Sequence, residues 1–164
     1  MVDVVANADL DRIYTSQDFA LGAETRDSMG RKFRFIKYNG GQLNAVDGVA
    51  GRLAIGLDAA YSFWEVTMDY VAAAETELTY RQMGFLQAAL TDGDFGWIQT
   101  KGPNRKAMLT DDGVSQGDML MKHATTDGAV DTHTGDVPIL GVALENDNDT
   151  THTLAAGYAE ITIE

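Results

Sequence analysis

The sequence predicts an all-β fold, a single-domain barrel or sandwich of roughly seven to ten short strands with an extended N-terminal arm. Two observations support this prediction. Short apolar or alternating segments recur between turn residues such as Asn39-Gly40-Gly41 and Asp92-Gly93. No long segment has the periodicity of an amphipathic helix, apart from a candidate over 75–90 that Gly84 interrupts. Barrels and sandwiches need the same alternation, so the choice between them stays open.

The chain of 164 residues fits one domain. We expect residues 1–28 to form an arm or lead-in, because their aromatic residues are scattered and their periodicity is weak. A short helix over 9–14 is an alternative reading of part of this arm. Residues 29–164 form the β-barrel or sandwich domain in this interpretation.

The first predicted strand covers 32–38. Its apolar residues alternate at Phe33 and Phe35 and change phase at Ile36 and Tyr38, which predicts a bulge or a strand end. The next predicted strand covers 64–70. Apolar and polar residues alternate along it, as in a half-buried strand.

The segment 84–102 predicts a β-hairpin. Its turn, Thr91-Asp92-Gly93-Asp94, contains the Asp-Gly pair that two-residue turns favour. Phe95 and Trp97 fall on one face of the second strand, and Ile98 on the other. Gly96 leaves room for another backbone or a ring to approach. We therefore expect these structural residues in the hairpin and core: Trp64, Asp92, Gly93, Phe95, Gly96 and Trp97.

Four further segments predict the remaining strands: 106–109, 118–122, 139–144 and 158–164. The segment 139–144 is continuously apolar, as expected of a strand that is buried on both faces. Ala159, Ile161 and Ile163 alternate in the last segment, so we expect them to face the core.

The net charge is −13 and is unevenly distributed. Residues 1–40 hold six acidic and six basic residues, whereas residues 122–164 hold eight acidic residues and one basic residue. So acidic a chain is not expected to bind nucleic acid directly, because phosphate affinity needs clustered Lys and Arg. The neutral N-terminal part would suit docking, although a solvated acidic surface with a few ion pairs also explains the pattern.

The composition also limits chemistry and compartment. There is no cysteine, so disulfides and thiolate metal sites are excluded. The N-terminal segment lacks the basic and apolar regions of a signal peptide, and no stretch has the roughly 20 apolar residues of a membrane span. We expect a soluble protein that is not exported by the usual route and has no membrane partner.

The sequence contains two candidate metal sites, and both are weakly supported. His123, His133 and His152 lack the short spacing of metal ligands, so we expect no metal site. The acidic loop 145–149 offers oxygen atoms for calcium but lacks the pattern of a calcium-binding loop, and turn formation explains it equally well. No nucleophile motif or phosphate-binding loop is present. We therefore expect no enzymatic activity and no cofactor.

The 84–102 segment, with its Ala88-Ala89-Leu90-Thr91-Asp92-Gly93-Asp94-Phe95-Gly96-Trp97 pattern, resembles a segment of small structural proteins of tailed bacteriophages. Among these phage proteins, the resemblance is to capsid decoration or cement proteins. The opening strand at 27–37 and the closing pair at 139–144 and 159–163 are also similar to theirs, so that the resemblance covers residues 27–164. The N-terminal arm is outside it.

This resemblance implies a virion structural protein that binds the exterior of the capsid and stabilises the shell. Its expected partners are the major capsid protein and further copies of itself, as a trimer or dimer. It would be made in the host cytoplasm. We expect the arm and the basic strand to face the capsid or other subunits, through Tyr14, Phe19, Arg31, Lys32, Arg34 and Lys37. The alternatives are a tail or fibre component and a glycan-binding module that uses Trp64, Trp97 or Tyr80.

Overall fold

The computed structural model describes residues 6–40, 47–56, 63–69, 82–109, 113–123, 125–134, 139–146 and 155–162, with the backbone alone at 105, 106 and 155–162. Ten strands and no helix occur in this part of the chain, which confirms the all-β prediction. The strands are β1 (Glu24–Arg26), β2 (Lys32–Tyr38), β3 (Leu53–Gly56), β4 (Glu65–Thr67), β5 (Gln82–Leu86), β6 (Phe95–Leu109), β7 (Met119–Lys122), β8 (Val130–Thr132), β9 (Gly141–Ala143) and β10 (Ala155–Thr162).

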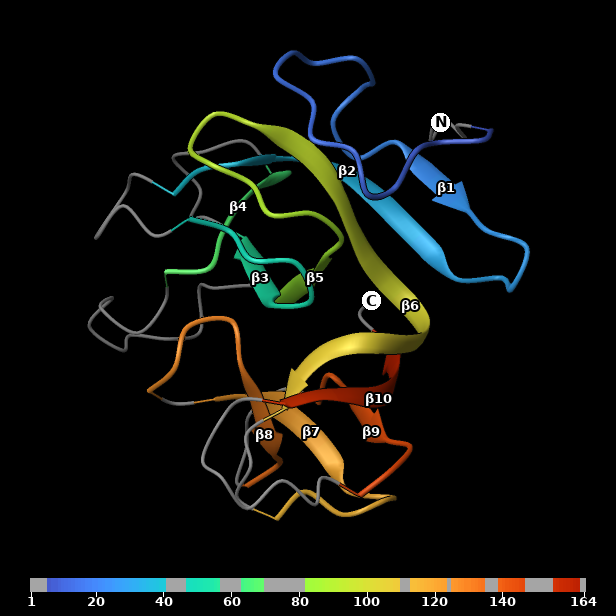
Figure 1. Cartoon of the computed structure of the whole chain (residues 1–164), viewed down its shortest axis with the longest axis vertical. Coiled ribbons are helices and arrows are strands. Elements are labelled where there is room, and N and C mark those ends of the chain that lie inside the picture. The colour runs from blue at the N-terminus through green and yellow to red at the C-terminus, as the bar shows by residue number, and fades with distance from the viewer. Residues whose placement is uncertain are drawn as a thin grey trace.

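The N-terminal half of the fold is a closed barrel (Figure 1). Its strands pair in the order β2-β4-β3-β5-β6, and β6 pairs back onto β2 to complete the ring. The pairing of β2 with β4 is parallel, and the other pairings in this ring are antiparallel. Closure leaves no free edge within the ring, and only the short strand β1 extends β2 on the outside.

The C-terminal half is a half-barrel built on the same long strand, β6 (Figure 1). β6 bends out of the first barrel and pairs with β10, and the order continues through β9, β7 and β8. β8 returns to β6 through a single parallel residue pair, Leu109 with Val130. One strand therefore supplies hydrogen-bonding partners to both halves of the molecule.

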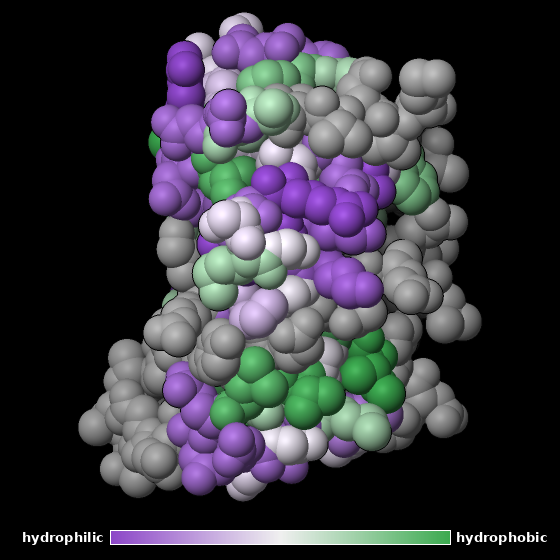
Figure 2. Space-filling view, turned by 90° about the vertical axis from the view of Figure 1, so that its right-hand side faces the viewer, coloured by the Kyte–Doolittle hydropathy of each residue, from purple (hydrophilic) through white to green (hydrophobic). Residues whose placement is uncertain are grey.

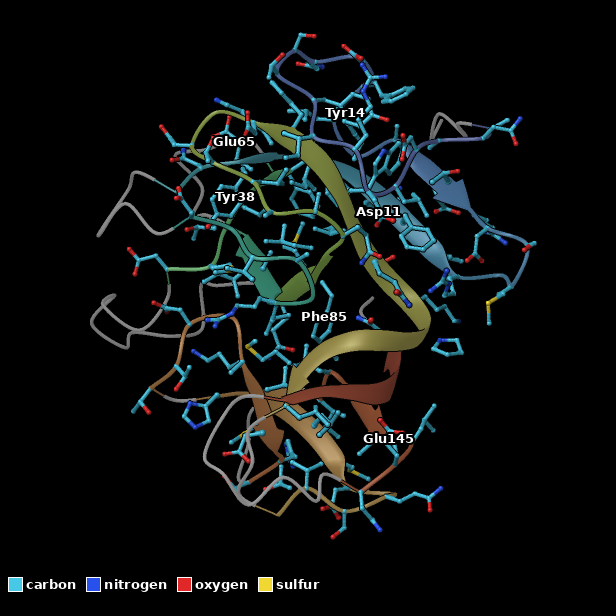
Figure 3. The ribbon with its side chains drawn as sticks, viewed as in Figure 1. Asp11, Tyr14, Tyr38, Glu65, Phe85 and Glu145 are labelled. Atoms are coloured by element: carbon cyan, nitrogen blue, oxygen red, sulfur yellow. The ribbon has the colours of Figure 1, made fainter. Side chains whose placement is uncertain are left out.

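The core consists of three clusters of buried residues. The barrel cluster fills the closed barrel and includes Ile36, Tyr38 and Ile98. The arm cluster lies on the outside of the same strands and includes Phe35 and Trp97. The half-barrel cluster is made of these residues: Leu53, Phe85, Ala107, Leu109, Val114, Leu120, Val130, Leu140 and Ala143. Because Leu53 and Phe85 come from barrel strands, the core is continuous between the two halves (Figure 3 labels Phe85).

The two clusters on either side of β2 explain why the alternation of its apolar residues changes phase. Phe33 and Phe35 pack in the arm cluster, whereas Ile36 and Tyr38 pack in the barrel cluster on the opposite face. The register shift between β2 and β6 lies at Lys32/Phe33. No register shift lies at 36–38, so the predicted bulge is absent, whereas β2 does end at Tyr38, which was the other alternative. The apolar pattern changes phase because both faces of the strand are buried there and each needs apolar residues.

The predicted hairpin is confirmed as an antiparallel strand pair, with Phe85 opposite Gln99. Its connection, residues 87–94, is longer than the predicted two-residue turn. Leu90 leaves the ladder and exchanges backbone hydrogen bonds with Gly48, at 2.7 and 3.1 Å. Asp92 and Gly93 still form a tight turn within this connection, in which Gly93 has a φ of +88°. The structure thus corrects the length of the connection and keeps the turn.

Two other strand predictions need correction. Thr67 and Asp69 are as buried as Val66, so the segment predicted as half-buried over 64–70 has polar side chains inside. The predicted doubly buried segment 139–144 is instead partly exposed, at Ile139 and Val142. The 75–81 part of the possible helix lies outside the described residues, and the helix considered over 9–14 is absent.

Candidate functional site

The N-terminal segment packs against the barrel. Tyr14 pairs with Phe95 through two backbone hydrogen bonds of 3.0 and 2.8 Å, and its side chain is only 4% exposed. The ring of Phe19 lies edge-on to that of Phe35, with 5.1 Å between centroids, and 5.5 Å from Trp97. Tyr14 therefore belongs to the core rather than to a docking surface, and Phe19 is half-buried beside it (Tyr14 is labelled in Figure 3).

Most cations of the basic strand form ion pairs within the chain. Arg34 and Arg26 each contact one carboxylate oxygen of Glu24 at 3.0 Å. Lys37 Nζ lies 3.6 Å from Glu65 Oε1, on the neighbouring strand. These pairs reduce the charge that Arg34 and Lys37 can offer to a partner.

Arg31 is held in the turn between β1 and β2. The Asp27 carboxylate accepts hydrogen bonds from the backbone N–H groups of Met29 and Arg31, at 2.9 and 3.0 Å, and from Arg31 Nε at 2.6 Å. Burial raises the pKa of Asp27, but the hydrogen bonds from Arg31 outweigh it and lower the pKa below its usual value. Arg31 therefore fixes the turn and presents Met29, which is 65% exposed, at its tip.

Lys32 and Lys101 differ from these paired cations. They are direct register partners across β2 and β6. Among the described residues, neither lysine has an acidic partner within ion-pair distance. Like charges directly opposite each other on a sheet are destabilising. Within the described residues, Lys32 is therefore the cation of the predicted basic strand that has no ion pair.

Exposed apolar residues lie on the same sheet face as the lysine pair. Thr162 of β10 pairs with Lys101, and Glu160, two positions earlier, pairs with Val142 of β9. Since residues two apart share a face, Lys101 and Val142 point to the same side of the sheet. Val142 in turn pairs with Met119 of β7. The exposures of these two side chains are 36% and 53%.

Figure 2 shows the right-hand side of the view in Figure 1, where hydrophobic residues gather at the level of the half-barrel, below hydrophilic residues. Among the described residues of this half, the exposed large apolar ones are Met119, Ile139 and Val142. We call the set of Met119 and Val142, with Ile139 preceding β9, the apolar strip. Asp131 of β8 lies on its far side, because it pairs with Met121, which lies two residues after Met119 on the same face.

The histidines do not form a metal site in the part of the chain that the structure describes, where no group of three metal-ligating side chains occurs. His123 Nδ1 accepts a hydrogen bond from the backbone of Thr125, and its Nε2 lies 3.9 Å from Asp131. His152 and residues 147–149 of the acidic loop fall outside the described residues. Asn146 of that loop accepts a hydrogen bond of 2.7 Å from the backbone of Gln116, and Glu145 is exposed after β9 (Figure 3).

The tryptophans are placed for packing. Trp97 is fully buried, so it cannot form a sugar platform. Trp64 is half-buried against Gly22, with the Arg34 guanidinium 5.4 Å from its ring. Phe63 lies edge-on to Trp64 and is exposed, whereas Tyr80 falls outside the described residues. The space next to Gly96 is occupied by the side chain of Leu90, because a Cβ at position 96 would lie 3.0 Å from Leu90 Cδ1.

The sequence did not predict the placement of three residues. Lys101 was passed over because it is isolated in sequence, and only the β2–β6 register brings it to Lys32. Val142 was placed in the core by its apolar neighbours. Gln99 is fully buried, which its polar type does not predict.

No helix in the described ranges is long and apolar enough to cross a membrane. Comparison with known proteins adds no assignment: no family model, no curated protein and no solved structure matches this chain.

Proposed function

We propose that this chain is a structural protein of a tailed-bacteriophage virion that binds the exterior of the capsid and stabilises the shell. The observation that carries the proposal is the 84–102 segment. The residues that resemble small phage structural proteins make up much of β5 and the first half of β6, on which both halves of the fold are built. The resemblance thus involves the framework of the fold, not a peripheral loop.

The proposed partners are the major capsid protein and further copies of this chain, as a trimer or dimer. Two features favour binding to protein surfaces. The turn between β1 and β2 holds the exposed Met29 in a fixed position, and the apolar strip is exposed on the half-barrel. Exposed apolar residues that are grouped on one face are typical of protein interfaces.

We place the shell-facing surface on the N-terminal half, at the turn between β1 and β2 and the adjoining basic strand. This half is the less acidic one: residues 1–102 hold 14 acidic and 9 basic residues, a net charge of −5, whereas residues 103–164 hold 11 and 3, a net charge of −8. Docking through it would keep the more acidic half away from the shell. The arm contributes by packing under this surface, since Tyr14 and Phe19 support β2 and β6 from outside.

The test is co-sedimentation of the purified protein with expanded, undecorated phage capsids, followed by electron cryomicroscopy of the particles. We expect saturable binding and symmetric density on the outside of the shell. A chain that binds no capsid form, but sediments with isolated tails or fibres, would overturn the decoration role. Substituting Met29→Asp at the exposed turn should lower occupancy, whereas Val49→Asp, at an exposed position in the 47–52 segment, should not.

A further inference from the structure

Strand β1 is an edge strand. The strand order begins with it, and β2 is its neighbour on one side, so that β1 lies at the outside of the barrel in Figure 1. Among the described residues, no backbone hydrogen bond reaches the other side of β1. The open edge of a strand offers N–H and C=O groups to a further strand. This edge is therefore a candidate for pairing with another chain.

The hydrogen bonds between β1 and β2 show which residues of β1 face outward. Ala23 and Asp27 form backbone hydrogen bonds with the opposite arm of the hairpin, at 3.0 and 3.3 Å. In an antiparallel pair, residues that bond to the neighbouring strand alternate with residues that do not. Thr25, midway between these two, therefore bonds to β2. The backbone groups of Glu24 and Arg26 point away from β2, towards the open edge.

The described part of the N-terminal segment leaves room beside this edge. Ala8 and Leu10 pack against the arm cluster, which contains Phe33, the register partner of Thr25. This segment and residues 25–28 together line a hollow of about 230 Å³. The segment therefore lies over the Thr25 face of β1, and its described residues do not fill the space next to 25–28.

The two outward-facing residues carry opposite charges. Glu24 and Arg26 share a face of β1, and Arg26 Nε lies 3.0 Å from Glu24 Oε1. The other carboxylate oxygen of Glu24 contacts Arg34, also at 3.0 Å. The side chain of Arg26 is 58% exposed. Because a guanidinium carries five N–H donors, Arg26 can bind a second carboxylate besides that of Glu24.

We propose that β1 pairs with the β1 strand of a second copy of the chain, in an antiparallel dimer whose two-fold axis passes through Thr25. In this register, Glu24 of each copy lies opposite Arg26 of the other. Each of these residue pairs exchanges two backbone hydrogen bonds, as hydrogen-bonded antiparallel pairs do. The contact is self-complementary, because both the hydrogen bonds and the charge contact are made twice.

Charge selects this register and this occupant. The outward backbone groups also allow a shift by two residues in either direction. One shift places Glu24 opposite Glu24 of the second copy, and the other places Arg26 opposite Arg26. Like charges directly opposite each other are destabilising, whereas opposite charges stabilise a strand pair. A second copy running antiparallel carries both charges in the order that this edge complements.

The dimer is compatible with docking through the turn between β1 and β2. The two β1 strands run in opposite directions, so the turns that follow them, each with an exposed Met29, lie at opposite ends of the contact. The proposal deepens the self-association proposed above and does not depend on binding to a shell.

Sedimentation velocity of the isolated protein tests the dimer directly. We expect a monomer–dimer equilibrium over a concentration series from micromolar to millimolar. A wild-type protein that stays monomeric throughout the series, or that forms trimers without dimers, would overturn the proposal.

A proline at position 26 tests whether the strand edge is the interface. Arg26→Pro removes an outward N–H group but no hydrogen bond to β2. Arg26→Ala is the matched control, because it loses the same side chain and keeps the N–H group. We expect the dissociation constant of Arg26→Pro to be at least about tenfold higher than that of Arg26→Ala. Circular dichroism checks that both variants fold, and equal dissociation constants would show that the interface lies elsewhere.

Two variants mixed together test the register. Glu24→Lys and Arg26→Glu each place like charges opposite each other in a homodimer, so each alone should dimerise at least about tenfold more weakly than wild type. In the mixed dimer, opposite charges face each other at both contacts. We therefore expect more dimer in an equimolar mixture than in either separate solution. A mixture with no more dimer would overturn the register.

Glu24→Lys also removes the contact with Arg34 within the chain, so its fold is checked by circular dichroism. If it does not fold, the comparison of Arg26→Pro with Arg26→Ala still decides whether β1 is the interface. A failed dimer test leaves capsid co-sedimentation as an independent test of shell binding, so the two proposals fail separately.

Discussion

The side-chain amide of Gln99 donates a hydrogen bond of 3.0 Å to the carbonyl of Gly102, on the same strand. The same nitrogen lies 3.3 Å from the carbonyl of Lys101 and 3.1 Å from that of Pro103. These carbonyls belong to the part of β6 that leaves the barrel for the half-barrel. A single buried amide therefore satisfies backbone acceptors where the shared strand bends.

Replacing this amide should destabilise the fold. Gln99→Leu keeps a similar volume but removes the donor, and unsatisfied buried carbonyls cost about 1–3 kcal/mol. Gln87→Leu is the matched control, because Gln87 is also buried but donates to one carbonyl only, that of Phe85. We expect a larger loss of unfolding free energy for Gln99→Leu in urea denaturation. A smaller loss than for Gln87→Leu would contradict this role.

Alanine substitutions at Gly22 and Gly30 distinguish the stability cost of backbone strain from that of a steric clash. Both have a positive φ, +82° and +79°. A Cβ at Gly22 would collide with the Trp64 indole, whereas a Cβ at Gly30 meets no atom within 4 Å. Gly30→Ala should cost about 1–2 kcal/mol for the left-handed backbone alone. Gly22→Ala should cost a further ~1–3 kcal/mol for displacing the indole. Thermal melts measure both, and equal losses would show that Trp64 moves freely.

Phe19 tests whether the N-terminal segment is part of the core. Phe19→Ala removes ring contacts with Tyr14, Phe35 and Trp97 and should cost about 2 kcal/mol. It should also shift tryptophan fluorescence to longer wavelength as Trp97 gains access to water. Ile13→Ala is the control, because Ile13 is exposed and should leave both readouts unchanged. Deleting the whole segment would therefore test stability as well as docking.

Because Tyr38 is buried, we expect the free energy of unfolding to fall at alkaline pH. Burial in the barrel raises the pKa of Tyr38 from 10.0 to about 12, and the charges of Asp47 and Asp69 add to the shift. The folded state thus favours the neutral phenol, while the unfolded chain ionises near pH 10. The contribution of the Tyr38 phenol to the free energy of unfolding is fully present below pH 10 and is lost as the pH rises towards 12.

Melting temperatures measured across this range check the expectation. Tyr38→Phe removes the titrating group but loses the hydrogen bond that the Tyr38 hydroxyl accepts from Met68 at 3.4 Å. The variant should start less stable and lose less stability between pH 10 and 12 than wild type. Parallel pH profiles for the two proteins would refute a raised pKa at Tyr38.

The fold class could be predicted from the sequence because turns and alternation are local properties. Asp92-Gly93 and the faces of Phe95, Trp97 and Ile98 followed from residue types within a few positions. The second cluster on the outside of β2 could not be predicted, because it depends on the arm folding back over Phe35. The change of phase therefore suggested a bulge or a strand end, whereas its cause is that both faces of β2 are buried.

The candidate surface was predictable only in part. The basic strand drew attention to residues 31–37, but which cations stay unpaired depends on Glu24, Asp27 and Glu65 lying beside them in space. Lys32 and Lys101 are far apart in sequence and become neighbours only through the pairing of β2 with β6. Such relationships arise from register, which residue types alone do not fix.

The strand shared by the two halves also constrains how the chain can be made. β6 ends at Leu109, and its long partner β10 begins at Ala155, after 45 intervening residues. During synthesis the barrel strands β2–β6 can pair early, whereas the second half of β6 must wait with its amide and carbonyl groups exposed until β10 emerges. The nascent chain therefore passes through a stage in which one half is folded and its longest strand offers an open edge, and this stage is the one that most needs protection from aggregation.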